Sequence, residues 1–422
     1  MGGVRKDAMT RLSRMMWPLL LALVAGCGST SSPVPSNPTN IQLIRVRLVQ
    51  ETDRVSLSCS GNPYFSLANS PDQRELVFSP GQSVAVTLSA SGWQIGAAQI
   101  PPGVLTLRPP AGGSLAVNAN WYRGEMRLVP VVTAGSGGRF DVVNDLSVED
   151  YLKGVLAREL YRDWHLETYK AQAIVARTYA LYHARTEGVG RYWDVYPDTR
   201  SQVYGGLAAE TDKSRTAVEE TSGIVLTYGP GEGKIFEAFF SSCCGGVSQD
   251  ASAVFPQAPA IPPLAARVNG DRCIASPYFS WPPVTIARGE LTRRLQLWGS
   301  RQNPPRPVAG VVDVARVDIA GKNLFGRPTH FRITDSAGPV FILPAEDFRA
   351  AINTDAQAGT TVPSSFFQIN NGASTVKFFN GHGLGHGVGM CQWCAEAQAA
   401  QGQSCEDILS TAYPQAKLVR AY

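Results

Sequence analysis

The stretch that decides the fold is SVEDYLKGVLAREL, residues 147–160 of this 422-residue chain. Ser147 followed by Asp150 fits a capping box at the start of a helix. The apolar residues that follow recur at the spacing of an amphipathic helix. They are Val148, Tyr151, Leu152, Val155 and Leu156. Four residues beyond Val155 the same stripe reaches Glu159, so the pattern predicts a carboxyl group at the end of a buried face, where desolvation favours its protonated form.

A second helix is expected to follow directly, at about residues 166–186. Its alanines are spaced along most of its length, at positions 171, 173, 176, 180 and 184, with Arg177 among them. Small side chains let a helix approach its neighbours closely. The two segments therefore predict a packed helix pair.

The flanking sequence predicts strands. Short runs of alternating apolar and polar residues, separated by Gly, Pro and Asn, fill residues 41–120 and indicate a small β domain. Residues 125–130 and 140–144 then predict a hairpin that opens the main domain, and residues 224–240 and 308–343 are mostly β in pattern. With a short Ala-rich helix expected at 392–401, the fold class is α+β, a mixed β-sheet domain with a helix pair, preceded by the small β domain.

The first 26 residues are typical of a secretion signal that is absent from the mature protein. A basic segment precedes an apolar run, residues 15–25, that is too short to span a bilayer. Val24-Ala25-Gly26-Cys27 then resembles a bacterial lipobox, in which the cysteine is diacylated and becomes the N-terminus. We expect lipid on Cys27; the alternative is an ordinary signal with an incidental cysteine.

Residues 27–40 are expected to be this lipidated cysteine and a solvated tether. The 13 residues after Cys27 are rich in Ser and Pro and could reach about 45 Å when extended. Residue 28 is Gly rather than Asp, so in a cell envelope with two membranes the expected location is the outer membrane, facing the periplasm. Removing the leader lowers the formal net charge from +4 to +1, which leaves no basic surface for nucleic acid.

Four blocks between residues 149 and 395 occur in the order found in one family of bacterial cell-wall proteins. They are 149–181, DTRSQVYGG at 198–206, FFSSCCGG at 239–246 and GLGHGVGMCQWCA at 383–395. On these blocks the chain resembles the SpoIID/LytB family, from about residue 120 to the C-terminus. The resemblance implies a catalytic domain at 121–422 and a lytic transglycosylase that cleaves peptidoglycan glycan strands stripped of their stem peptides.

The family's catalytic glutamate matches Glu159. Hydrolysis of a glycoside ordinarily needs two carboxylates, whereas a transglycosylase needs one, which protonates the leaving oxygen and then accepts the proton of the muramic acid 6-hydroxyl. The alternative is that Glu159 caps or salt-bridges a helix end. The resemblance also suggests a set of substrate-binding residues, namely Arg177, Gln202, Tyr204, Gly385, His386, Gly387 and Gln392. For His386 the alternative is a hydrogen-bonded residue that holds its loop.

Seven cysteines follow Cys27, at positions 59, 243, 244, 273, 391, 394 and 405. Cys243, Cys244, Cys391 and Cys394 depart from the commonest family pattern. A disulfide from Cys243 or Cys244 to Cys273 or Cys391 is the first expectation for an exported protein. The reaction requires no cofactor, and a structural zinc at these cysteines is the alternative, since some family members carry zinc near the third block. Cys391 and Cys394 also have the spacing of a redox pair at a helix start.

A different class of function stays open. Family members have been considered amidase enhancers, and residues 41–120 have the pattern of a module that binds the wall or a partner. The expected partners are therefore glycan strands, the membrane through the N-terminal lipid, and a wall amidase.

Overall fold

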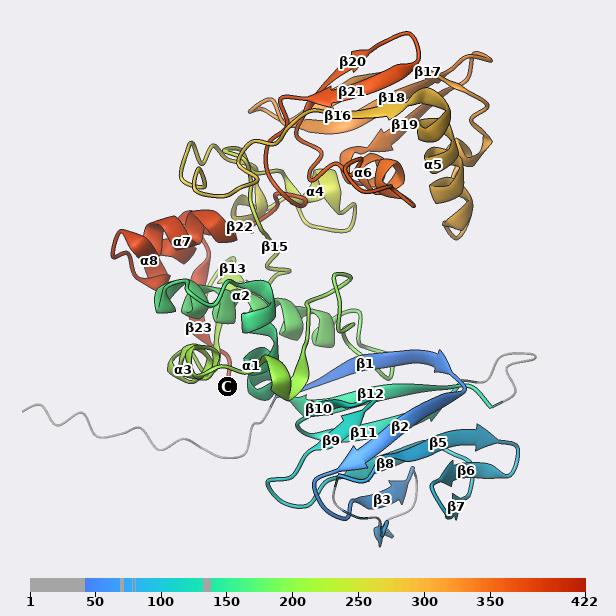
Figure 1. The fold of residues 1–422 in the computed structure, drawn as a ribbon. Coiled ribbons are helices and arrows are strands. Elements are labelled where there is room, and N and C mark those ends of the chain that lie inside the picture. The colour runs from blue at the N-terminus through green and yellow to red at the C-terminus, as the bar shows by residue number, and fades with distance from the viewer. Residues whose placement is uncertain (1–41, 69–71, 78, 80, 132–137) are drawn as a thin grey trace, which may run out of the picture. The chain divides into compact units, whose positions relative to one another are not determined.

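The computed structural model describes residues 42–422 except 69–71, 78, 80 and 132–137 (Figure 1). This part of the chain contains helices and several mostly antiparallel sheets, which confirms the α+β class. The signal, the lipobox with Cys27 and the tether lie outside the described residues. Among the helices that are described, none combines the length and the apolar character needed to cross a membrane.

Two six-stranded sheets are built from the first part of the described chain. The strands of one sheet, in spatial order, are β1 (Leu43–Thr52), β12 (Phe140–Ser147), β11 (Glu125–Pro130), β8 (Leu105–Arg108), β3 (Tyr64–Leu67) and β4 (Arg74–Glu75). The strands of the other are β10 (Asn120–Tyr122), β9 (Leu115–Val117), β2 (Arg54–Cys59), β5 (Val84–Ser89), β6 (Gly92–Ile95) and β7 (Ala98–Ile100).

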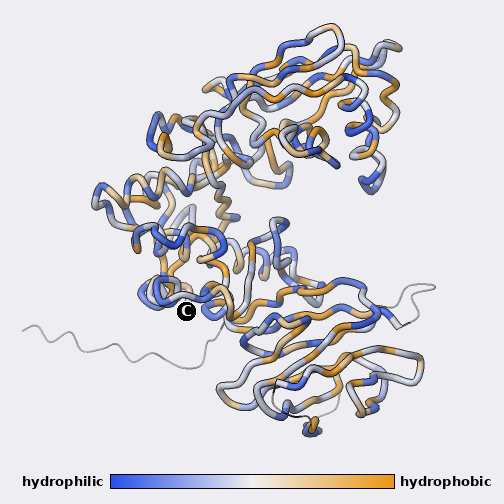
Figure 2. The backbone as a smooth tube through the Cα atoms, viewed as in Figure 1, coloured by the Kyte–Doolittle hydropathy of each residue, from blue (hydrophilic) through white to orange (hydrophobic). Residues whose placement is uncertain are grey.

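The alternation expected for these strands is present. In β2 the residues Val55, Leu57 and Cys59 are buried while their neighbours are not, and Figure 2 shows hydrophobic and hydrophilic residues alternating in this region. Both sheets contribute to one hydrophobic core, in which Trp93 of β6 meets Phe140 of β12 edge to face with ring centroids 5.0 Å apart. The expected hairpin is β11–β12, and it pairs with β1 and β8, so this sheet continues across residue 120.

The helix pair follows β12 directly. Ser147 is the N-cap of α1 (Val148–Glu159) and accepts a hydrogen bond from the backbone N–H of Asp150, as the sequence predicts. The predicted apolar stripe of α1 is buried. The second helix is α2 (Leu166–Arg185), and η1 (Gly206–Ala209) and α3 (Asp212–Glu220) pack beside the pair.

Helix α2 lies between two hydrophobic cores. Ala173, Ala176 and Ala180 belong to the core shared with the two sheets. Ile174 and Val175 belong to a second core, formed with α7 (Gln392–Ala400) and α8 (Cys405–Ala412). The strands beside this second core are β14 (Lys234–Ile235), β13 (Ile224–Tyr228) and β23 (Lys417–Arg420), which form one sheet, and β15 (Phe240–Ser241), which pairs in parallel with β22 (Met390–Cys391).

The segment between β15 and β22 has a hydrophobic core of its own, made of residues 281–378. Its sheets are β16 (Val284–Ala287), β21 (Thr375–Phe379) and β20 (Gln368–Asn371), and β17 (Val314–Lys322), β18 (Pro328–Asp335) and β19 (Val340–Pro344). Its helices are α4 (Ala251–Val254), α5 (Arg288–Arg301) and α6 (Ala345–Asn353), with two 3₁₀ turns, η2 (Pro262–Leu264) and η3 (Pro307–Gly310). Since β15 and β22 pair, the chain returns from this segment to the place where it left.

The packing around α2 predicts a sharp penalty for added volume. Ala176 is fully buried, so Ala176→Leu should lower the free energy of unfolding by about 1 to 3 kcal/mol. Ala400→Leu is the matched control, because Ala400 is exposed at the end of α7, and it should change stability by less than about 0.5 kcal/mol. Urea unfolding of both variants checks this; equal stabilities would contradict the close packing of α2.

Candidate active site and cysteine cluster

A cleft of about 770 Å³ is lined by residues from several separate parts of the chain. The end of α1 contributes Glu159, α2 contributes Tyr179 and His183, and α6 contributes Glu346 and Arg349. The loop before β22 and the start of α7 supply Leu384, Gly385, His386 and Gln392. The third sequence block, 239–246, supplies residues 239–242. The size is that of a site for a small ligand or a short part of a polymer.

Glu159 is the last residue of α1 and its carboxylate is held by two polar groups. The backbone N–H of Val203 donates to Oε1 at 2.8 Å, and the Gln392 side chain also hydrogen bonds to the carboxylate. Desolvation by burial is the largest influence and raises the pKa of Glu159 above its ordinary value, although both hydrogen bonds act against it. The desolvation predicted from the helix pattern is therefore confirmed.

The other carboxylates of the cleft have basic partners. Asp194 pairs with Arg45, Glu187 with Arg191, and Glu346 with Arg349. Glu237 hydrogen bonds to His183, with its Oε1 3.0 Å from Nε2. Among the described residues that line the cleft, Glu159 is the carboxyl group without an ion pair. An unpaired and desolvated carboxyl group is the one suited to carry a proton.

His386 lies in the cleft wall but its ring is occupied. Nδ1 accepts a hydrogen bond of 3.0 Å from the backbone N–H of Val388, and the ring also hydrogen bonds to the backbone of Phe240. Desolvation lowers the pKa of His386 to about 4, so the ring is neutral at physiological pH. These contacts agree with the alternative that His386 holds its loop.

A glycine of this loop makes room for the Arg327 side chain. Gly387 has a φ of +73°, and a Cβ atom there would lie 2.2 Å from Nη1 of Arg327. The Arg327 guanidinium is buried and donates to the carbonyls of Gly385 and His386 at 3.4 and 3.1 Å. Gly387 is not part of the cleft lining, and its positive φ and the nearby Arg327 give a structural reason for a glycine at this position. Its contact with a sugar stays a prediction.

Three other residues expected to bind substrate do not reach the cleft. Arg177 is fully buried, and its Nε and Nη2 donate to the two carboxylate oxygens of Glu149 at 2.9 and 2.7 Å. Gln202 is buried and accepts a hydrogen bond of 3.2 Å from the Tyr151 hydroxyl. The hydroxyl of Tyr204 donates to Oδ1 of Asn144 at 3.1 Å. In this structure the polar groups of all three are bonded inside the protein and lie outside the cleft lining, and their contact with substrate stays a prediction.

The sequence analysis missed several cleft residues. Tyr179 and His183 lie on α2, Glu237 lies in the loop between β14 and β15, and Arg349 lies on α6. These side chains come together only when the three segments meet. For Tyr179 and His183 a signal existed, since they are four residues apart on one face of the Ala-rich helix. For Glu237 and Arg349 there was no signal in the sequence.

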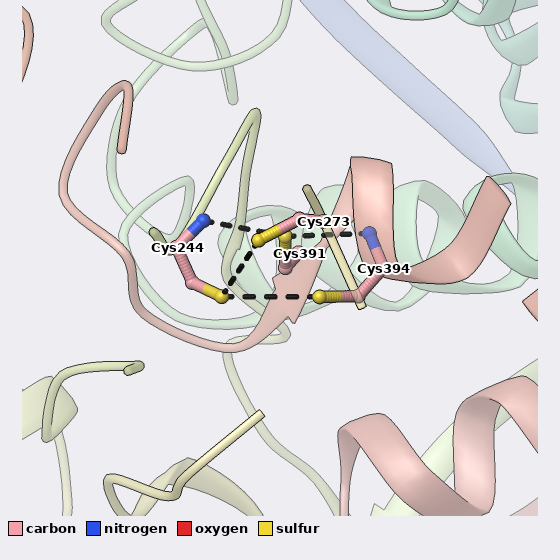
Figure 3. A group of neighbouring side chains, drawn as sticks. All are labelled: Cys244, Cys273, Cys391 and Cys394. Carbon is pink, nitrogen blue, oxygen red and sulfur yellow. Dashed lines mark hydrogen bonds between the residues drawn. The ribbon is translucent and has the colours of Figure 1, made fainter. Parts of the chain in front are cut away.

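A second group of residues lies beside the cleft. The thiols of Cys244, Cys273, Cys391 and Cys394 all lie within 4.8 Å of one another and are buried (Figure 3). The Cys244 sulfur is 3.6 Å from that of Cys273 and 3.8 Å from that of Cys394. All seven described cysteines are free thiols in this structure, whereas the disulfide expected from the sequence would bring two sulfurs to about 2.05 Å. That pairing stays a prediction.

The sulfur distances fit a tetrahedral metal. At a Zn–S distance of about 2.3 Å, two sulfurs at the corners of a tetrahedron are about 3.8 Å apart. Backbone N–H groups of Cys244 and Cys394 point to the Cys391 sulfur at 3.3 and 3.4 Å, as they would to a thiolate. This buried four-cysteine cluster is able to hold a structural metal.

The ligand set differs from the candidates named from the sequence. Cys243 is buried beside the cluster but its thiol is not one of the four. Cys394 takes that place, at the start of α7, where the sequence places a helix. The two-residue spacing of Cys391 and Cys394 is also a common spacing of zinc ligands, and that reading of the motif would have found Cys394.

Comparisons with known proteins place relatives of this chain in one family. The model of the SpoIID family, described as stage II sporulation protein, matches residues 136–228. The chain is 30% identical to an uncharacterized protein of Brachyspira hyodysenteriae over 70% of this chain and 72% of that protein. It is 28% identical to a protein named Amidase enhancer of Bacillus subtilis over 62% of this chain and 39% of the other, and 28% identical to Stage II sporulation protein D of the same organism over 64% and 74%.

The buried pair of Arg177 and Glu149 predicts a structural phenotype. Arg177→Met leaves Glu149 without its main partner. Breaking such a pair should lower the free energy of unfolding by about 3 kcal/mol. This is the low end of the usual range, because the Glu149 side chain is 21% exposed. Arg158→Met, at an exposed position of α1, should leave the stability within about 0.5 kcal/mol. Thermal and urea unfolding check the difference. If Arg177→Met unfolded like the native protein but bound glycan strands poorly, Arg177 would be a substrate residue after all.

Proposed function

The chain belongs to the SpoIID family of cell-wall remodelling proteins, and on that premise we propose that it is a peptidoglycan lytic transglycosylase acting on peptide-stripped glycan strands. One observation carries the proposal. Glu159 is the cleft carboxyl group that has no ion pair among the described residues and whose pKa is raised by desolvation. A single proton-carrying residue suits a reaction in which the same group acts first as acid and then as base.

The proposed reaction uses Glu159 twice. Protonated Glu159 donates its proton to the glycosidic oxygen that follows a muramic acid residue, and the bond from that oxygen to C1 breaks. The 6-hydroxyl of the same muramic acid then attacks C1 and gives its proton to the Glu159 carboxylate. The new bond closes a 1,6-anhydro ring, and no water is consumed. The Val203 N–H and the Gln392 side chain hydrogen bond to the carboxylate between the two steps.

Gly385 and Gln392 are the predicted substrate residues that fit this proposal directly. Both line the cleft, and Gln392 also contacts Glu159. His386 contributes through its loop, since its ring nitrogens already have backbone partners. Helix ends and loops at a cleft place backbone N–H and C=O groups next to a bound sugar chain, where they can hydrogen bond to its neutral hydroxyl and acetamido groups.

A wall amidase is the proposed partner. Such an enzyme removes stem peptides and would supply the stripped strands, and one relative of this chain is named Amidase enhancer. A non-catalytic enhancer is the alternative function. We further propose that the protein works in the cell envelope, held by lipid on Cys27; that part of the proposal rests on the lipobox alone.

We also propose that Cys244, Cys273, Cys391 and Cys394 hold a structural zinc ion. The four thiols are buried and spaced like the corners of a tetrahedral zinc site. The ligands come from the third block, from a loop of the following segment and from the start of α7. A metal there would join these three segments next to Gln392, while four protein ligands leave no open position for catalysis.

The catalytic assignment predicts that Glu159→Gln abolishes strand cleavage. The amide keeps the shape and can still accept the Val203 N–H, but it transfers no proton, and each lost acid or base step is worth about 10² to 10⁴-fold. Release of 1,6-anhydro ends from peptide-stripped strands, followed by mass spectrometry, measures the loss. In the native protein the rate should fall as the pH rises through the raised pKa of Glu159, since the first step needs the protonated acid.

The control for this variant is Glu167→Gln. Glu167 lies outside the cleft and its carboxylate bonds to Lys170 and to the Cys405 backbone, so the control should cleave strands normally. Folding of Glu159→Gln should also be normal, because a desolvated carboxylate gives way to a neutral amide. Anhydro products formed by Glu159→Gln at the native rate would mean that Glu159 is structural.

The metal assignment predicts stoichiometric zinc in the purified protein. Cys394→Ser should lose most of it and unfold at a markedly lower temperature, because binding of a structural metal contributes to the stability of the folded state. The control is Cys59→Ala, which should keep its zinc. It removes a buried thiol of β2 that is not one of the four clustered cysteines. Elemental analysis and thermal unfolding with and without a chelator are the measurements. A protein that contains no metal and is insensitive to the chelator would contradict the proposal.

A further inference from the structure

Arg349 presents part of its guanidinium to the cleft. Its Nε donates to Oε2 of Glu346 at 2.6 Å, one turn earlier in α6. Its two terminal nitrogens have no hydrogen-bond partner among the described residues, and the side chain is 28% exposed. When an arginine is bonded only through Nε, the N–H groups of its two terminal nitrogens stay available to bind a planar anion such as a carboxylate.

Glu346 fixes this orientation. Its carboxylate is largely buried, and Oε1 accepts a hydrogen bond of 2.6 Å from the Ser365 hydroxyl while Oε2 accepts from Arg349. The buried Arg327 is a second cation close to Glu346. Glu346 therefore shares its negative charge between two arginines, which leaves the charge of Arg349 only partly compensated. His386, on the same wall, is neutral at physiological pH and adds no charge.

The other two arginines of the cleft are bonded to carboxylates of the protein. Arg200 donates to the Asp198 carboxylate from Nε, at 2.9 and 3.3 Å, and from Nη2, at 2.7 Å. Its guanidinium also lies 3.9 Å from the centre of the Tyr196 ring. Both terminal nitrogens of Arg191 point to Glu187, each at 3.4 Å. Among the described cleft residues, Arg349 is the arginine with an open edge.

A glycan strand offers one kind of anion to such a group. Its hydroxyl and acetamido groups are neutral, whereas each muramic acid carries a lactyl carboxyl group. That carboxyl group is a neutral amide while a stem peptide is attached and a free carboxylate once the peptide has been removed. A free carboxylate matches the paired donors of arginine in both charge and geometry.

We propose that Arg349 binds the free lactyl carboxylate of a muramic acid residue in the cleft and so makes the protein select peptide-free strands. The proposal rests on the proposed function for its substrate. Arg349 acts in specificity and takes no part in proton transfer, because the acid and base steps belong to Glu159. Glu346 is the positioning residue that holds the guanidinium.

The experiment compares binding and cleavage of three strand preparations: peptide-free strands, strands with their stem peptides, and peptide-free strands whose carboxylates have been converted to amides. Binding is measured with the inactive Glu159→Gln protein, with and without Arg349→Gln, so that the result does not depend on catalysis. We expect Arg349→Gln to weaken binding of peptide-free strands by about 10- to 100-fold, the usual effect of losing a charge-assisted pair. Binding of the other two preparations should not change.

Further variants separate recognition from folding. Arg349→Lys keeps the charge beside Glu346 but loses the paired donors, so it should fold normally and bind peptide-free strands with an intermediate affinity. Arg306→Gln, an exposed arginine outside the cleft, should bind all three preparations like the parent. In the catalytically active protein, Arg349→Gln should raise KM for peptide-free strands and leave kcat nearly unchanged.

Two outcomes would overturn the proposal. One is a parent protein that binds peptide-free and amidated strands equally well. The other is an Arg349→Gln protein that loses affinity equally for all three preparations, as a general disturbance of the cleft would produce. Both are separate from a failure of the proposed function, which would appear as the absence of anhydro products from the native protein while the binding differences remain.

Discussion

The burial of α2 between two hydrophobic cores is the constraint on which the rest of the structure depends. Alanines face the core shared with the two sheets, and Ile174 and Val175 face the core formed with α7 and α8. Because the alanine side chains are small, neighbouring helices approach closely on both sides. The end of α1 and the start of α7 therefore meet over the same helix, and this brings Gln392 to Glu159.

The charges in and around the cleft follow from the same packing. Buried carboxylates need partners, and Asp194, Glu346 and Glu149 each have an arginine. Glu159 has only neutral donors, so desolvation is not offset by a cation and its pKa rises. The cysteine cluster lies beside this site and holds the start of α7 against the third block. The candidate acid Glu159 and the cysteine cluster thus lie at one junction of the chain.

Periodicity in the sequence predicted much of the fold. The helices α1, α2 and α7 and the hairpin of β11 and β12 lie where local patterns placed them, since helix and strand repeats are properties of neighbouring residues. The partners of polar side chains were not predictable in the same way. Arg177 lies in a recognised block, yet the carboxylate that it pairs with, Glu149, is on another helix. Which polar group is exposed depends on contacts that no local pattern contains.

The sequence by itself determined the α+β class, the family and the placement of Glu159 on a buried helix face, because each rests on residues close together in the chain. Only the tertiary structure decided which groups reach the cleft and which sulfurs lie together. Cys244 and Cys394 are far apart in sequence and 3.8 Å apart at their sulfurs, and Arg349 enters the cleft from the segment inserted between β15 and β22. These contacts exist because β15 and β22 pair and return the chain to one point, and such pairing depends on packing between distant segments.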